Sequence, residues 1–248
     1  MRAKETERAP DPTEVVAIDG PSGAGKSTVA RLVAERLAFQ FLDTGAMYRA
    51  VTWHFLERNC APDQLSDDRG AAERVMRAVL DAMELRLLPG GRVLVDDRDV
   101  TAHLRSREVE ARVSTVSALP FVRQAMAALQ RRVAVHGPVV AEGRDMGSVV
   151  FPRARWKVYL DADPAERARR RARDFEQRGR QVTEREVLEE IEVRDRLDTT
   201  RKDAPLVQAD DAHYLDSTGK TTEAVVEAVL ALVRGTGAGA LPRGGKRS

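Results

Sequence analysis

The sequence predicts an α/β fold: a doubly wound parallel sheet of about five strands flanked by helices. Short apolar runs at residues 15–18, 139–141 and 156–160 have the length and composition of buried strands. Each run is followed by polar residues and then by helical apolar spacing, most clearly at 26–38. Because strands that alternate with helices pair in parallel, we expect helices on both faces of the sheet.

The core domain is expected to span residues 14–234, assembled from 14–59 and 136–234. Its last strand is predicted at 214–215, where the apolar run is shorter, and its last helix at 221–233.

The middle of the chain departs from this alternation. Residues 84–96 read as two short strands around a Pro-Gly-Gly turn, and helical patterns follow at 106–116 and 120–135. We therefore expect a small α+β insertion over about 60–135.

The composition is that of an ordinary globular protein, with 42% hydrophobic and 32% charged residues in 248. The net charge of +2 gives no reason to expect a nucleic acid or a membrane surface as partner. Cys60 is the only cysteine, which excludes an intrachain disulfide. The four histidines lack metal-ligand spacing, so surface or packing roles are expected.

Both ends of the chain are polar. Residues 1–13 and 235–248 are expected to be disordered, the second as a basic tail. The first segment has no apolar stretch of the kind found in signal peptides, and no run approaches the ~18 apolar residues of a membrane span. A cytoplasmic protein is the expectation.

Residues 20–27 (GPSGAGKS) match the G-x-x-x-x-G-K-S pattern of a phosphate-binding loop, between a predicted strand and a predicted helix. Glycines allow positive φ and bring backbone N–H groups close to a phosphate, and the helix N-terminus adds its dipole. Lys26 is expected to neutralise the β- and γ-phosphates of ATP, and the Ser27 hydroxyl to ligate Mg²⁺. The nucleotide-binding residues that this pattern predicts are Gly20, Pro21, Ser22, Gly23, Ala24, Gly25, Lys26, Ser27 and Thr28.

The loop indicates a nucleoside triphosphate but not the fate of its phosphate, because motors, GTPases and kinases all use it. A hydrolytic machine would also carry an acidic residue at the end of an apolar strand, and Glu142 and Asp161 both match this loosely. The reaction therefore has to be read from other segments.

Two further segments have the composition of an acceptor site. Residues 43–49 (DTGAMYR) read as a strand end and a Thr or Asp cap that opens a helix, and alone they favour a capped helix with a surface arginine. Residues 142–147 (EGRDMG) follow an apolar strand, where open α/β sheets bind their ligands. The adjacent Arg144 and Asp145 suit a substrate with both a phosphate and an amino-pyrimidine edge.

These motifs resemble those of bacterial cytidylate kinases, a branch of the nucleoside monophosphate kinase superfamily with the P-loop fold. The resemblance covers the chain from about Val15 to Val233. Its marks are IDGPSGAGKST (18–28), LDTGAMYRA (42–50), LPFVRQAM (119–126), EGRDMGSVVFP (142–152) and APLVQADDAHYLDST (204–218). The first is shared with many kinases, whereas the second and fourth, with the large insertion, are specific to the cytidylate branch.

The resemblance implies roles for residues in three of these segments. Thr44 and Asp145 would contact the cytosine ring or the ribose, with Asp145 accepting from the exocyclic amine. Arg49 and Arg144 would bind the monophosphate. Arg123, in the insertion, would help to select cytosine.

The resemblance also assigns roles near residue 200. Arg194 would reach a phosphate, and Asp198 and Arg201 would hold the pentose. Leu197 and Thr199 stand at positions that are usually charged in the family, so this segment departs from its pattern.

Residues 164–180 form the most basic segment of the chain. Alone, they favour a solvated Arg-rich helix over an RNA-binding one. In the family they correspond to a lid, about 164–182, that closes over ATP. Arg167, Arg170 and Arg171 lie one helical turn or less apart, and Arg170 is the candidate for contacting ATP.

The expected reaction is in-line transfer of a phosphoryl group from MgATP to CMP or dCMP, with Lys26, Arg144 and Asp145 as catalytic residues. A kinase for UMP, AMP or shikimate is an alternative, and a P-loop ATPase or nucleic-acid-associated switch is a more distant one. The expected partners are small-molecule substrates, with no nucleic acid or membrane, and the chain is expected to be a monomer.

Overall fold

The computed structural model describes residues 15–65, 68–177 and 179–236. The terminal segments that the sequence predicts to be disordered lie outside these residues, apart from Gly235 and Thr236.

The contacts of the chain divide it into two compact units. Unit 1 consists of Met1–Leu42 and Gln130–Ser248, and unit 2 of Asp43–Leu129. None of the helices that the structure describes is long and apolar enough to cross a membrane.

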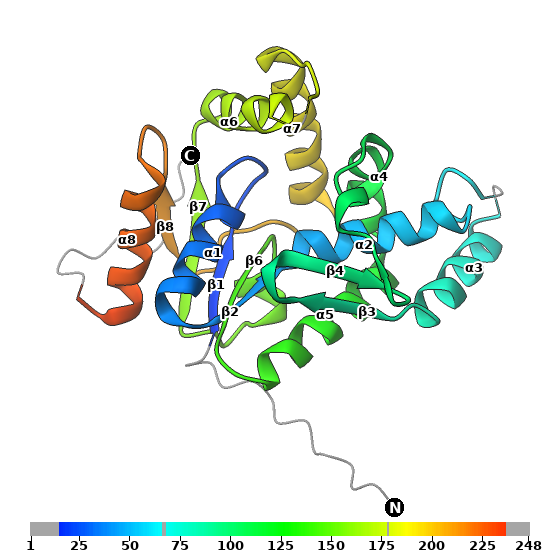
Figure 1. Ribbon diagram of the computed structural model, residues 1–248, viewed down its shortest axis with the longest axis horizontal. Helices are drawn as coiled ribbons and strands as arrows, with labels where there is room; N and C mark the ends of the chain where they lie inside the picture. Colours follow the sequence, from blue (N-terminus) through cyan, green and yellow to red (C-terminus); the bar gives the residue numbers. More distant parts are fainter. Residues whose placement is uncertain (1–14, 66–67, 178, 237–248) are drawn as a thin grey trace, which may run out of the picture. The chain divides into compact units, whose positions relative to one another are not determined.

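Unit 1 is built on the five-stranded sheet that the sequence predicts. The strand order is β2-β6-β1-β7-β8 (Figure 1). The strands are β1 Val15–Asp19, β2 Gln40–Asp43, β6 Val139–Gly143, β7 Trp156–Asp161 and β8 His213–Asp216. Strand β1 is buried along its whole length and runs parallel to both neighbours, as β7 does to β8. The predicted parallel α/β fold is therefore confirmed.

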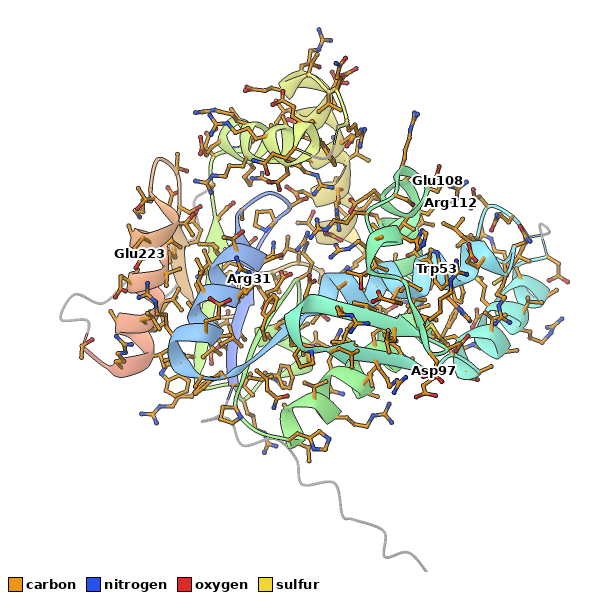
Figure 2. The ribbon with its side chains drawn as sticks, viewed as in Figure 1. Arg31, Trp53, Asp97, Glu108, Arg112 and Glu223 are labelled. Atoms are coloured by element: carbon orange, nitrogen blue, oxygen red, sulfur yellow. The ribbon has the colours of Figure 1, made fainter. Side chains whose placement is uncertain are left out.

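Helices α1 (Lys26–Leu37) and α8 (Thr222–Arg234) pack against each other over this sheet (Figure 1). The core between them contains Val16, Ile18, Val29, Val33, Leu160, Leu215, Val226 and Leu230. At the surface, Arg36 of α1 donates to Glu223 and Glu227 of α8 at 2.7 and 2.9 Å; Glu223 is labelled in Figure 2. The two helices follow the 3.6-residue spacing of their apolar positions.

Helices α6 (Pro164–Glu176) and α7 (Glu184–Thr200) form a second apolar cluster in unit 1. Its buried members are Ala168, Ala172, Phe175, Val187 and Ile191. The guanidinium carbons of Arg171 and Arg180 lie 4.8 and 4.4 Å from the centroid of the Phe175 ring. Arg171 of α6 and Arg180, which follows this helix, therefore pack on an aromatic ring of the same cluster.

The described part of unit 2 combines helices with a three-stranded antiparallel sheet in the order β3-β4-β5. Its elements are α2 Thr44–Glu57, α3 Arg69–Asp81, β3 Leu85–Leu88, β4 Arg92–Val95, β5 Arg98–Asp99, α4 Arg107–Ser117 and the first part of α5 Pro120–Val135. The predicted two strands around the turn are present as β3 and β4. Trp53 of α2, labelled in Figure 2, stacks on His103 with ring centroids 6.1 Å apart.

Unit 2 starts at Asp43, earlier than the residue 60 at which the sequence places the insertion. The reason is that α2 packs against α4 and β4, so its apolar face belongs to this core. The functional division into a core, an acceptor-binding insertion and a lid stays a prediction.

Candidate active site

The loop between β1 and α1 has the backbone of a phosphate-binding loop. Gly20, Gly23 and Gly25 have φ angles of 149°, 78° and 87°. A Cβ at Gly20 would stand 1.9 Å from the carbonyl oxygen of Leu160, so no other residue fits there. Gly25 caps α1 in the left-handed conformation, which directs the first N–H groups of the helix into the loop.

Lys26, the first residue of α1, is only 5% exposed. Its Nζ donates to the carbonyl oxygen of Pro21 at 2.6 Å and so lies over the loop. Burial, and next the positive charge of Arg144, lower the pKa of Lys26 well below its usual value. A buried ammonium of this kind favours an anionic ligand, because nearby negative charge stabilises its charged form.

Ser27, in the first turn of α1, meets Glu142 near the end of strand β6. The Ser27 Oγ donates to Glu142 Oε1 at 2.7 Å, and the β1–β6 register places Glu142 opposite Ile18. Hydroxyl and carboxylate oxygens are suitable partners for Mg²⁺ and its waters. Among the described residues no group of three or more His, Cys, Asp or Glu could hold a metal by itself. The donor set therefore fits a Mg²⁺ whose other ligands are phosphate oxygens and water.

Arg144, Asp198 and Arg201 form a buried ionic cluster. Asp198 accepts from Arg144 Nε at 2.9 Å and from Arg201 Nη1 at 3.3 Å. Burial alone would raise the pKa of Asp198, but Arg144, Arg194 and Arg201 together hold it below its usual value. The structure thus brings together four predicted site residues: Arg144, which follows β6, and Arg194, Asp198 and Arg201 from α7 and its C-terminal end.

Asp145 is buried at the start of a single π-turn, Met146–Val150. The carboxylate that accepts from the N–H groups of this turn is Asp19, at the end of β1. Burial raises the pKa of Asp19 to about 6, although these two hydrogen bonds lower it. Sequence reasoning missed Asp19, and the only signal was its position directly before the glycine-rich loop.

Arg170 of α6 lies beside the phosphate-binding loop. Its Nη1 is 3.8 Å from the position that a Cβ on Gly25 would take. The guanidinium donates to Glu166 at 2.9 Å and to the Oγ and carbonyl oxygen of Ser217 at 2.9 and 2.8 Å. Arg170 therefore lies next to the loop that is predicted to bind ATP. Its contact with ATP stays a prediction.

A second arginine of α6 holds the same loop, and sequence reasoning did not assign it. Arg167 donates to the carbonyl oxygens of Ser22 and Ala162, both at 3.0 Å, and forms an ion pair with Asp195 of α7. Asp195 in turn accepts from the Ser22 N–H at 3.0 Å. Helices α6 and α7 are thereby both hydrogen-bonded to the loop.

In unit 2, Asp43 and Arg49 form a compact pair at the start of α2. Asp43 caps the helix by accepting from the Ala46 N–H at 2.7 Å, and both of its oxygens lie 3.4 Å from Arg49 Nη2. A Cβ on Gly45 would be 3.0 Å from Arg49 Nη1. Arg49 is 7% exposed, and its buried Nε has no hydrogen-bond partner within the described structure. The surface arginine that the segment alone favours is therefore wrong, and the guanidinium has a donor left for an anion.

Thr44 and Arg123 are also buried in unit 2. Arg123 of α5 donates to the carbonyl oxygen of Ser117 at 3.1 Å, and its guanidinium carbon lies 5.5 Å from the centroid of the Tyr48 ring. Since Thr44 and Tyr48 are one helical turn apart on α2, the structure gathers these side chains around one end of that helix.

A phosphate-binding loop on a parallel sheet, a buried lysine and a Ser–Glu pair define a P-loop nucleotide-binding protein. Within that class, the family model of cytidylate kinase matches residues 16–235. The chain belongs to the cytidylate kinase family.

Curated relatives agree with this assignment. The cytidylate kinase of Carboxydothermus hydrogenoformans is 46% identical over 221 residues, which are 88% of this chain and 96% of that protein. The bifunctional pantoate ligase/cytidylate kinase of Synechococcus sp. strain CC9902 is 52% identical over 223 residues, 89% of this chain but 45% of that protein. The chain therefore spans less than half the length of that bifunctional relative. Two solved structures, one from Thermus thermophilus and a shikimate kinase from Acinetobacter baumannii, align over 94% of this chain at 19% and 17% identity, with TM-scores of 0.43 and 0.37.

Proposed function

We propose that this protein transfers a phosphoryl group from MgATP to CMP and dCMP, which yields CDP and dCDP. The observation that carries the proposal is the buried Lys26 on a glycine-rich loop, in a chain 46% identical to a cytidylate kinase over nearly the full length of both. The alternatives of another acceptor or of a nucleic-acid-associated switch are not favoured by the family.

On the donor side, the loop of residues 20–28 binds the phosphates of ATP through backbone N–H groups, and Lys26 neutralises their charge. Arg170 lies beside this loop and would bind the nucleotide on lid closure. Ser27 would hold the Mg²⁺, with Glu142 hydrogen-bonded behind it. A Mg²⁺ held there would supply positive charge to the phosphates of ATP.

On the acceptor side, Arg49 and Arg144 bind the phosphate of CMP, and the buried Nε of Arg49 supports this assignment. Asp145, Thr44 and Arg123 select the base by accepting from, or donating to, its polar edge. The phosphate and the pentose of the acceptor are also bound by Arg194, Asp198 and Arg201, which lie in α7 or directly after it. Asp198 accepts hydrogen bonds from Arg144 and Arg201.

The transfer requires no general base. At neutral pH the phosphate oxygen of CMP is already ionised, and it attacks the γ-phosphorus as the bond to the β–γ bridging oxygen of ATP breaks. The charge that develops lies on oxygens faced by Lys26 and the arginines, so positioning and charge neutralisation account for the acceleration. Exclusion of water by the lid would suppress ATP hydrolysis.

The proposal places the protein in the cytoplasm, acting as a monomer on small molecules in pyrimidine nucleotide metabolism. A coupled ADP-release assay at fixed MgATP tests it with CMP, dCMP, UMP, AMP and shikimate as acceptors, and with none. We expect kcat/KM for CMP and dCMP to exceed that of the other acceptors by about tenfold or more. ADP release that is independent of acceptor, or fastest with AMP or shikimate, would contradict the proposal.

A further inference from the structure

The carboxylate of Asp19 connects the first strand of the sheet to the segment that carries Arg144 and Asp145. Its Oδ1 accepts from the Met146 N–H at 2.8 Å and its Oδ2 from the Gly147 N–H at 2.7 Å. Asp19 stands opposite Gly143 in the β1–β6 register, so it reaches these groups directly across the ladder. Each oxygen therefore holds one of two successive backbone donors that open the π-turn.

At a helix start, such N–H groups commonly donate to the side chain of the N-cap residue itself. At this turn the N-cap residue is Asp145, and its side chain makes no capping hydrogen bond. Because Asp19 satisfies the two N–H groups, the turn is capped without the carboxylate of Asp145.

We propose that Asp19 is a positioning residue for the acceptor: by capping the Met146–Val150 turn from the neighbouring strand, it fixes the orientation of Asp145 and Arg144 toward CMP. This inference rests on the proposed function, because that proposal gives Asp145 and Arg144 their ligand.

The surroundings of Asp19 leave little room for an alternative arrangement. A Cβ on Gly147 would stand 3.4 Å from Asp19 Oδ2 and 3.2 Å from Lys157 Cδ, so the turn is confined on two sides. The charged groups that act on Asp19 are Asp145 and Lys26. A carboxylate with two short hydrogen bonds in a buried site defines one geometry, which an amide in its place does not reproduce.

The test is Asp19→Asn. Asparagine keeps the size and one accepting oxygen but turns the other oxygen into an NH₂ group that faces an N–H donor. Losing one such buried hydrogen bond predicts a rise of about tenfold in KM for CMP, with KM for ATP within about twofold of wild type. The matched control is Asp68→Asn. Asp68 also accepts from two successive backbone N–H groups, those of Gly70 and Ala71, but at the exposed start of α3. The KM of this variant for CMP should equal that of the wild type.

A double-mutant cycle with Asp145→Ala separates positioning from a general loss of structure. If Asp19 acts in part through Asp145, Asp19→Asn raises KM for CMP by a smaller factor in the Asp145→Ala background than in the wild type. Equal tenfold effects in both backgrounds, or an unchanged KM in Asp19→Asn alone, would overturn the inference. These results require a wild-type protein that phosphorylates CMP; if the wild type does not, it is the proposed function that fails.

Discussion

The phosphate-binding loop of unit 1 and the Asp43–Arg49 segment of unit 2, which we propose binds the phosphate of CMP, hold their buried positive charge by different means. In the loop, backbone N–H groups and three glycines of positive φ surround one buried lysine. In the second segment, a single buried arginine is held by a single carboxylate, and the site depends on side chains. A backbone site requires a distinctive residue pattern, whereas an Asp and an Arg on one helix occur in many proteins without a ligand. The first kind of site can therefore be read from sequence, and the second requires the burial that only a structure gives.

Removing the cation of the loop is expected to have the largest effect. Lys26→Met has a similar volume without the charge, and kcat should fall by about 10³-fold because the transferred phosphoryl group loses a buried partner. Initial rates at saturating MgATP and CMP measure this. Lys220→Met, at an exposed lysine, is the control that keeps the wild-type rate. A Lys26→Met rate within about threefold of wild type would remove this lysine from the mechanism.

The dependence of the loop on backbone geometry is tested by Gly20→Ala. A Cβ 1.9 Å from the Leu160 oxygen, at a φ of 149°, should lower the free energy of unfolding by at least about 3 kcal/mol. Gly219→Ala is the matched control: its φ is 67°, but nothing lies within 4 Å of its Cβ, so about 1 kcal/mol is expected. If urea denaturation shows the same loss of unfolding free energy for Gly20→Ala and Gly219→Ala, the close approach of Gly20 to Leu160 does not determine stability.

The side-chain site of unit 2 is tested by Arg49→Met. We expect KM for CMP to rise by about 50-fold, because a charged hydrogen-bond partner of the phosphate is lost. The dissociation constant of a non-hydrolysable ATP analogue should change by less than about twofold. Arg58→Met, at an exposed arginine of the same unit, should leave both constants unchanged. Weaker binding of the ATP analogue with an unchanged KM for CMP would assign Arg49 to the donor instead.

The smallest expected effect concerns Asp19 and pH. Burial raises the pKa of Asp19 to about 6, so between about pH 4 and 6 the folded protein binds more protons than the unfolded chain. The stability of the wild type relative to Asp19→Asn should therefore increase as the pH falls from 7 to 5, by on the order of 1 kcal/mol. Urea denaturation of both proteins at pH 5, 6 and 7 measures this difference. A difference that does not change with pH would mean that Asp19 titrates outside this range.

Much of the fold could be predicted because buried parallel strands are continuous apolar runs. The runs at 15–18, 139–141 and 156–160 all fall inside strands of the sheet. Two helices were not predicted although their signals are present. Helix α3 has buried Ala72, Met76 and Leu80 at intervals of four, and α7 opens with a capping box from Thr183 to Glu186.

The candidate site could be predicted only in part, since some of its interactions join distant residues. Asp19 and the Met146 N–H are 127 residues apart in the chain, and Ser22 and Asp195 are 173 apart. No local pattern marks such pairs. Arg49 shows the same limit, because its sequence neighbours are compatible with exposure and only packing reveals that it is buried.

The most direct test is to incubate the wild-type protein with MgATP and CMP and to measure the nucleotides by chromatography over time. A cytidylate kinase forms one CDP for each ADP, and forms almost no ADP when CMP is left out. ADP that accumulates at the same rate with and without CMP, and without CDP, would show an ATPase and contradict the proposed function.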